Sequence, residues 1–327
     1  MRRADLAAPV EALLAHYGLY AARWRTVATL DCTVLRIVPT QGPELSLRLY
    51  PHTKPALAPV ETELAWLTDL AAHGVAVPRP ISDREGRTVQ TWPDARHAVL
   101  LTWLRGRFLD AGLQPLHLRQ TGRLIARLHA SADRLAVAGQ HDTATRAADG
   151  PDLAAWARNL RPPSRAWPRR AQAAASRAAQ QLIEEIATWP RGPESWGLIH
   201  GDLHPWNLVY TSGEAGAIDF SDCGWGWRAL DFASTLQYLQ HPLAGNHDHR
   251  ARYPAMRAQL LEGYAELRPL WPGAERQIDA MLLARWLNTV EWILDDWPRI
   301  DLRPFGPGLL RGVVPILAPT PGAGAAP

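Results

Sequence analysis

The sequence predicts an α+β protein made of two lobes, a small lobe rich in β-strands and a larger helical lobe after it. The 327 residues are enough for about two lobes of roughly 150 residues each. Apolar residues make up 47% of the chain and charged residues 20%, which allows a sizeable core and excludes wholesale disorder. The apolar spacing becomes mostly helical near residue 115, and this change predicts the division into lobes.

The predicted small lobe covers residues 1–103. A weak helical pattern runs over residues 1–20. A clearer amphipathic helix runs from Val60 to Leu70, where apolar residues recur every three or four positions before Gly74 ends the pattern. Short apolar and β-branched runs predict extended segments around this helix. These segments lie at 25–30, 32–38, 45–50, 75–81, 88–92 and 98–103.

The predicted helical lobe covers residues 104–318. It has an irregular, proline-rich segment at 141–170, and a tail of mostly Pro, Gly and Ala at 319–327 is expected to be disordered. Helical spacing predicts the remaining long elements, with short strand signals among them. Helices are expected at 115–132, 171–187, 229–240, 251–267 and 275–295, and strands at 198–202, 208–210 and 217–220.

Charge and cysteine content exclude several classes of protein. The formal charge of +3 is mildly basic and scattered, so no nucleic-acid partner is expected. Apolar runs such as Ala98–Leu104 are far shorter than the about 20 residues of a membrane-spanning helix, so no such helix is expected. Asp5 and Glu11 interrupt the apolar stretch that a signal peptide would need, so no signal peptide is expected. Cys32 and Cys223 are expected to be reduced thiols of a cytoplasmic protein.

Polar side chains gather in two short segments, Leu198–Leu208 and Ala217–Asp222. A loop holds Asp202 and Asn207, and a hairpin is expected to return Asp219 to the same place. Carboxamide and carboxylate oxygens are hard ligands that suit Mg²⁺ with retained waters and substrate phosphates. Asp202 then remains free to accept a proton from an attacking hydroxyl, as phosphoryl transfer requires. Each residue alone is an ordinary turn former, and only the combination favours the functional interpretation.

The spacing of these residues resembles the aminoglycoside phosphotransferase / choline kinase-like family, which includes type II homoserine kinases and has a protein-kinase-like fold. The family's HGDxxxxN loop is matched by His200–Asn207, its metal-binding IDF segment by Ile218–Phe220 and its DLA motif by Asp231–Ala233. Weaker matches extend the resemblance over nearly the whole chain, at Val77–Pro80, Leu100–Gly106 and Leu128–Ala130.

The resemblance implies ATP and Mg²⁺ as cofactors. It implies that Asp202 is the catalytic base and that Asn207 and Asp219 hold Mg²⁺. It also implies that Arg48, held by Glu63, contacts the α- and β-phosphates, which a fork-shaped guanidinium can do bidentately.

The same resemblance implies that the backbone of Thr102, Trp103 and Leu104 meets the adenine edge. His200 and Asp231 are expected to be structural, with Asp231 accepting hydrogen bonds from N–H groups of the catalytic loop.

Some positions depart from the family pattern or leave alternatives open. Trp206 stands where many relatives have glycine, and no Gly-rich loop precedes Val34. Arg48 has an alternative interpretation as an exposed strand arginine, and Glu61 competes with Glu63 as its ion-pair partner. Lys54 is the only lysine of the chain and is expected in a loop.

Two weaker signals have ordinary interpretations. His241, His247 and His249 are close in sequence, but a solvated loop fits their spacing better than a transition-metal site does. Cys223 follows the predicted metal-binding strand, and a small packed residue is favoured there over a reactive thiol.

The acceptor of the phosphoryl group is left open by the sequence. An aminoglycoside, an amino alcohol, homoserine, a sugar derivative or a protein serine fits the family, and a non-catalytic nucleotide-binding pseudokinase is the alternative from another class. No oligomeric state is predicted. Many arginines oppose a polycation and favour a small hydroxylated metabolite with a carboxylate or phosphate, unless they are merely solvated. They are Arg146, Arg158, Arg161, Arg165, Arg169, Arg170 and Arg285.

Overall fold

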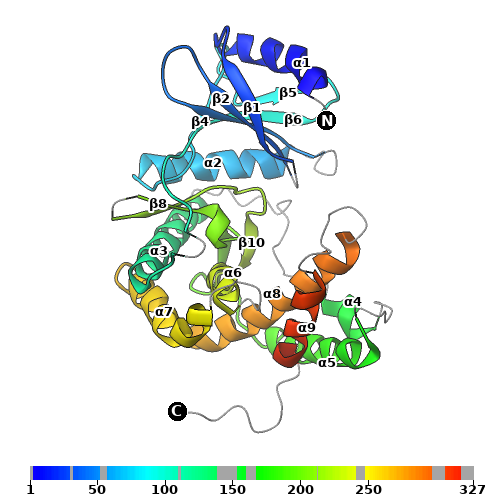
Figure 1. The fold of residues 1–327 in the computed structure, drawn as a ribbon. Helices are drawn as coiled ribbons and strands as arrows, with labels where there is room; N and C mark the ends of the chain where they lie inside the picture. Colours follow the sequence, from blue (N-terminus) through cyan, green and yellow to red (C-terminus); the bar gives the residue numbers. More distant parts are fainter. Residues whose placement is uncertain are drawn as a thin grey trace.

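The computed structural model describes residues 3–29, 32–51, 57–109, 112–137, 153–159, 167–211, 213–240, 247–296 and 306–317. A small antiparallel sheet forms the N-terminal lobe, and a larger, mainly helical lobe lies below it in Figure 1. The predicted two-lobe α+β fold is therefore confirmed. The expectations for Lys54 and for the tail at 319–327 lie outside the described residues.

The sheet of the small lobe is antiparallel throughout. Its strands lie in the order β1 (Arg23–Ala28), β2 (Thr33–Val38), β3 (Leu45–Leu49), β6 (His97–Thr102) and β4 (Pro80–Ile81), and β5 (Val89–Thr91) also pairs with β6. Only the last two residues of the extended segment expected at 75–81 pair with the sheet. Pro78 carries no N–H to donate to a ladder, which limits pairing before β4.

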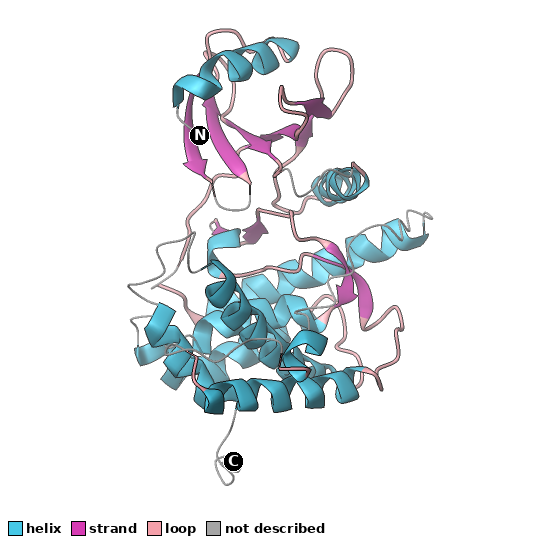
Figure 2. Cartoon of the chain, turned by 90° about the vertical axis from the view of Figure 1, so that its right-hand side faces the viewer, coloured by secondary structure: helices cyan, strands magenta, loops and turns pink. Residues whose placement is uncertain are grey.

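Two helices cover opposite faces of this sheet, α1 (Arg3–His16) above it and α2 (Ala58–Ala72) between it and the helical lobe (Figures 1 and 2). Alternation along β3 sends Leu47 and Leu49 into the core shared with α1. Arg48 lies between them and therefore points to the opposite face, toward α2. The sheet thus buries an arginine beside α2, where it forms an ion pair with Glu63.

The helical lobe contains two short antiparallel ladders among its helices. β7 (Trp196–Ile199) pairs with β10 (Gly224–Trp227), and β8 (Leu208–Tyr210) pairs with β9 (Ala215–Ala217). The helices are α3 (Pro115–Val137), α4 (Leu153–Ala157), α5 (Arg169–Ile186), α6 (Ala229–Gln240), α7 (His247–Ala265), α8 (Ala274–Asp296) and α9 (Gly306–Leu317), with a 3-10 turn η1 at Pro205–Asn207.

Three elements of this lobe were not predicted from the sequence. β10 has the sequence Gly-Trp-Gly-Trp, and glycine is a poor strand former. α4 is only five residues long. α9 contains three glycines, the first of them at its first residue, and Pro315 near its end. In each case packing against the larger core overrides a weak local preference.

Close contact between α3 and α7 depends on two glycines. A Cβ at Gly122 would overlap the carbonyl oxygen of Leu260, and a Cβ at Gly263 would overlap that of Arg119. We expect Gly122→Ala to lower the free energy of unfolding by about 1–3 kcal/mol, because the helices must separate to admit a methyl group. Denaturant unfolding measures this change. Gly192→Ala is the control, since no atom lies within 4 Å of its added Cβ; equal stability of both variants would contradict the prediction.

Two further features concern membranes and cysteines. None of the helices in the described ranges is long and apolar enough to cross a membrane.

Cys32 and Cys223 are both buried and form no disulfide, as the sequence predicted.

Candidate active site

The segment His200–Asn207 forms a loop between β7 and β8 that Asp231 holds from below. The two carboxylate oxygens of Asp231, a fully buried residue of α6, accept hydrogen bonds from the N–H groups of His200 at 3.2 Å and Gly201 at 2.8 Å. His129 of α3 contacts the same carboxylate at 3.2 Å through Nε2. Burial lowers the pKa of His129 to about 4, more than the hydrogen bond to Asp231 raises it. A neutral His129 can donate the proton on its Nε2 to Asp231. Because Asp231 in turn accepts the N–H groups of the loop, α3 and α6 together fix the loop.

His200 joins this loop to the segment that carries Asp219. Its Nε2 contacts the carbonyl oxygen of Ile218 at 3.0 Å, and its Nδ1 accepts the N–H of Asp202 at 3.3 Å. These two contacts require the tautomer with its proton on Nε2. Gly201 has φ of +82° and lies so close to the carbonyl oxygen of Asp222 that a Cβ would come within 2.7 Å. The structural roles predicted for His200 and Asp231 agree with these contacts.

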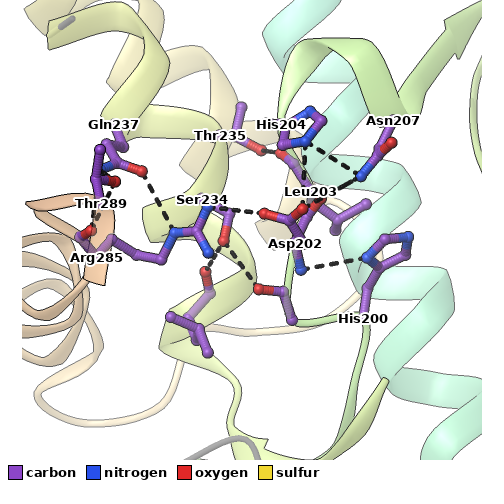
Figure 3. A network of polar contacts seen from close by, with 12 residues as sticks. His200, Asp202, Leu203, His204, Asn207, Ser234, Thr235, Gln237, Arg285 and Thr289 are labelled. Carbon is purple, nitrogen blue, oxygen red and sulfur yellow. Dashed lines mark hydrogen bonds and ion pairs between the residues drawn. The ribbon is translucent and has the colours of Figure 1, made fainter. Parts of the chain in front are cut away.

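Asp202 has its carboxylate in a dense polar network, shown in Figure 3. Its Oδ1 accepts a hydrogen bond from Nη2 of Arg285 at 2.7 Å, and its Oδ2 lies 3.2 Å from Nε2 of His204. Burial would raise the pKa of Asp202, but the His204 hydrogen bond and the Arg285 charge outweigh it and hold the pKa well below its usual range. Asp202 is therefore ionised at neutral pH and can accept a proton.

Asn207 and Asp219 have the chemistry of a magnesium site. The Nδ2 of Asn207 donates to the backbone carbonyl of Asp202 at 3.0 Å, which leaves its amide oxygen for a cation. Asp219 has φ of +61°, a conformation rare outside glycine, asparagine and aspartate. Its Oδ1 is buried and has no hydrogen-bond partner among the described residues. A buried carboxylate oxygen without a hydrogen bond and a carboxamide oxygen are hard ligands that fit Mg²⁺, which keeps several waters and binds phosphate oxygens.

Arg48 of the small lobe balances the charge of Asp219. Nη2 of Arg48 lies 3.4 Å from Oδ1 of Asp219. Burial would raise the pKa of Asp219, but Arg48 first and a hydrogen bond with Ser221 second lower it, against repulsion from Asp202. The repulsion between Asp202 and Asp219 indicates that the two carboxylates lie near each other.

Arg48 is held in a buried ion pair with α2. Its Nη1 donates to Oε1 of Glu63 at 2.7 Å, and the hydroxyl of Tyr50 donates to Oε2 of Glu63 at 2.7 Å. Arg48 is 6% exposed and Glu63 2%, whereas Glu61 is exposed. The alternatives of an exposed strand arginine and of Glu61 as its partner are therefore wrong.

We expect Arg48→Ala to lower both stability and nucleotide affinity. It leaves the Glu63 carboxylate buried without its cation, a change that typically costs about 3–5 kcal/mol. Arg48→Lys should retain part of both properties, because a point charge replaces a fork. Denaturant unfolding and calorimetry with Mg-ATP measure the two effects. Lys54→Ala is the control, and a larger loss from Lys54→Ala than from Arg48→Ala would contradict this assignment.

The backbone at Thr102–Leu104 is less available than the sequence suggested. The N–H of Thr102 donates to the carbonyl of Arg79 at 2.9 Å, and the N–H of Trp103 donates to the carbonyl of Glu44 at 3.0 Å. Among the described residues, the N–H of Leu104 has no such partner. Two of the three amides thus extend the pairing of β6 with the segments on its two sides, and the adenine contact expected here is left to the N–H of Leu104 and the carbonyl groups.

A cavity lies next to this segment but away from the catalytic candidates. Its lining includes Thr102–Leu104, Arg79 and the segment Gly74–Val77 that follows α2. Arg48, Asp202, Asn207 and Asp219 do not line it. Of the predicted site residues, only Thr102–Leu104 line this cavity.

Several sequence candidates lie outside the cluster or the described residues. His241 and three of the predicted arginines, Arg146, Arg161 and Arg165, fall in segments that are not described. Within the described ranges, no group of three or more His, Cys, Asp or Glu residues is arranged to hold a metal ion. Trp206 is 56% exposed, and its ring lies 5.2 Å from that of Tyr238 and 5.6 Å from that of His204. It stands at the exposed surface of the His200–Asn207 loop.

The contacts of Asp202 with His204 and Arg285 were not predicted. His204 lies inside the HGDxxxxN segment and was visible in the sequence, although no role was assigned to it. Arg285 is 83 positions from Asp202, and no local signal links the two residues. Only the packing of α8 against α6 brings them together.

Two solved kinase structures share this fold. The amicoumacin kinase hAmiN, solved with AMP-PNP, Ca²⁺ and Ami, matches with a TM-score of 0.76 at 19% identity over 97% of this chain and 96% of its own. A microcompartment-associated aminopropanol kinase matches with a TM-score of 0.77 at 22% identity over 95% and 96%. At these identities the likeness establishes the protein-kinase-like fold alone.

Sequence comparison establishes the family. The model of the phosphotransferase enzyme family matches residues 29–287, and the chain belongs to this family. A homoserine kinase of Caulobacter sp. (strain K31) is 34% identical over 72% of this chain and 68% of its own length. The amicoumacin kinase of Bacillus subtilis (strain 168) is 23% identical over 64% of this chain, and the match spans 62% of that kinase. The resemblance drawn from the His200–Asn207 motif is confirmed.

Proposed function

We propose that the protein transfers the γ-phosphoryl group of ATP to the hydroxyl of a small molecule, with Mg²⁺ as cofactor. The observation that carries the proposal is the ionised Asp202, fixed on a loop whose Asn207 and neighbouring Asp219 offer oxygen ligands. Family membership and the kinase names of the relatives support it. Because ATP is an intracellular substrate, we place this activity in the cytoplasm.

The residues divide the chemistry among them. When bound to Asn207 and Asp219, Mg²⁺ would neutralise phosphate charge and orient the β- and γ-phosphates. Arg48, fixed by Glu63, adds a second cation for the α- and β-phosphates. Asp202 orients the acceptor hydroxyl and accepts its proton as the oxygen bonds to the γ-phosphorus and the bond to the ADP oxygen breaks.

Two acceptor classes follow from the relatives. Homoserine is the first, because relatives of 30–34% identity over about 70% of this chain are named homoserine kinases. An antibiotic hydroxyl is the second, on the strength of the amicoumacin kinases. Measurement of ADP release with Mg-ATP over homoserine, amino alcohols, sugars, aminoglycosides and serine peptides tests the proposal. ADP release that depends on one of these acceptors supports it, and nucleotide binding without transfer to any of them favours a pseudokinase.

A further inference from the structure

Arg285 reaches the catalytic loop from α8 and touches the proposed base directly (Figure 3). Its Nη2 donates to Oδ1 of Asp202 at 2.7 Å, and its Nε donates to Oε1 of Gln237 at 3.3 Å. Gln237 of α6 is itself held, because its Nε2 donates to the carbonyl of Arg285 at 3.1 Å and to the hydroxyl of Thr289 at 2.7 Å. The guanidinium is therefore fixed in place beside the base.

This guanidinium has donors to spare. An arginine carries five N–H donors, and Arg285 uses one on Nε and one on Nη2. The other three have no hydrogen-bond partner among the described residues, although the side chain is only 15% exposed. A mostly buried cation with unused donors that touches the proposed base is positioned to contact an acceptor whose hydroxyl is presented to Asp202.

We propose that Arg285 binds an anionic group of the acceptor, a carboxylate or a phosphate, while the acceptor's hydroxyl is presented to Asp202. The substrate class is therefore a small hydroxyl compound that carries an anion, such as a hydroxy amino acid. This inference rests on the proposed function and adds a specificity-determining residue to it.

Charge and shape both favour an anion at this position. A guanidinium pairs bidentately with carboxylate or phosphate, which fixes the distance between the acceptor's anion and the base. Without Arg285, an anionic acceptor would meet the repulsion of Asp202, Asp219 and the ATP phosphates. An acceptor that carries several ammonium groups would instead be repelled by this cation.

The chain offers a matched control on the same helix. Arg276 of α8 forms an ion pair with Glu185 of α5 at 2.8 Å and has a side chain that is 77% exposed. Arg276→Ala removes the same charge from α8 without touching Asp202. Gln237→Ala tests the support of Arg285, because it removes the partner that orients the guanidinium.

The experiment measures kcat/KM by ADP release for two pairs of acceptors with the full-length protein and Mg-ATP. Homoserine and 3-aminopropan-1-ol differ by a carboxylate, and glycerol 3-phosphate and glycerol differ by a phosphate. We expect the wild type to prefer the anionic member of at least one pair by about 10²-fold. Arg285→Ala should abolish that preference, Arg285→Lys should restore part of it, Gln237→Ala should reduce it, and Arg276→Ala should leave it unchanged. The pair that shows the effect identifies the anion.

Three outcomes would overturn the inference. If Arg285→Ala lowers kcat/KM for both members of a pair equally, Arg285 serves only to position Asp202. If the wild type prefers the neutral or cationic member of both pairs, the anion site is absent while phosphoryl transfer stands. If no acceptor in either pair or in the wider screen supports ADP release, the proposed function itself fails and the inference fails with it.

Discussion

Replacing Asp202 with asparagine should lower turnover by about 10²–10⁴-fold, the usual loss when a general base is removed, and leave Mg-ATP affinity close to that of the wild type. The change is nearly isosteric, so the loop held by Asp231 should keep its shape. The amide cannot accept the hydroxyl proton. ADP release and calorimetry with Mg-ATP measure the two quantities.

The control for this substitution is Asp94→Asn, because Asp94 lies in the loop between β5 and β6, far along the sequence from the catalytic segment. Its turnover should match that of the wild type. Turnover of Asp202→Asn within a few-fold of the wild type would show that Asp202 is not the base.

Replacing Asp219 should remove Mg²⁺-dependent ATP binding more than it harms folding. Its buried Oδ1, which has no hydrogen-bond partner among the described residues, is the charged oxygen of the proposed metal site. Loss of an outer-shell partner already costs about 10–100-fold in metal affinity, so we expect loss of this direct ligand to cost more than about 10²-fold. Calorimetry of ATP binding with Mg²⁺ and with EDTA measures the effect.

Two variants separate the effect of losing a metal ligand from the effect of backbone strain at Asp219. Asp219→Ala also places alanine at φ of +61°, whereas Asp219→Asn keeps a residue type that tolerates this conformation. Both should lose Mg²⁺-dependent affinity, and Asp219→Asn should keep the wild-type unfolding midpoint more closely. Unchanged affinity in Asp219→Asn would place the metal elsewhere.

The parts that were predictable from the sequence are those with local signals. The motif from His200 to Asn207 lies in one loop, so its spacing alone predicts that Asp202 and Asn207 lie close together. Alternation along β3 places Arg48 on the face opposite Leu47 and Leu49, which brings it to α2.

The parts that were not predictable depend on long-range packing. The choice between Glu61 and Glu63 depends on how α2 is rotated against the sheet, and the structure decides it by burying Glu63. Arg285 meets Asp202 only because α8 packs on α6. The N–H groups of Thr102 and Trp103 looked available in sequence, but they bond to carbonyls of Arg79 and Glu44 in other segments.

The central claim is that this protein moves a phosphoryl group from ATP to a hydroxyl by means of Asp202. Mass spectrometry of the acceptor after incubation with Mg-ATP tests it most directly, with homoserine as the first acceptor and the wider screen behind it. The wild type should convert an acceptor to its phosphate ester in equal amount to the ADP formed, and Asp202→Asn should give about 10²–10⁴-fold less ester in the same time. ADP formed without any phosphorylated acceptor, or equal ester from both proteins, would contradict the claim.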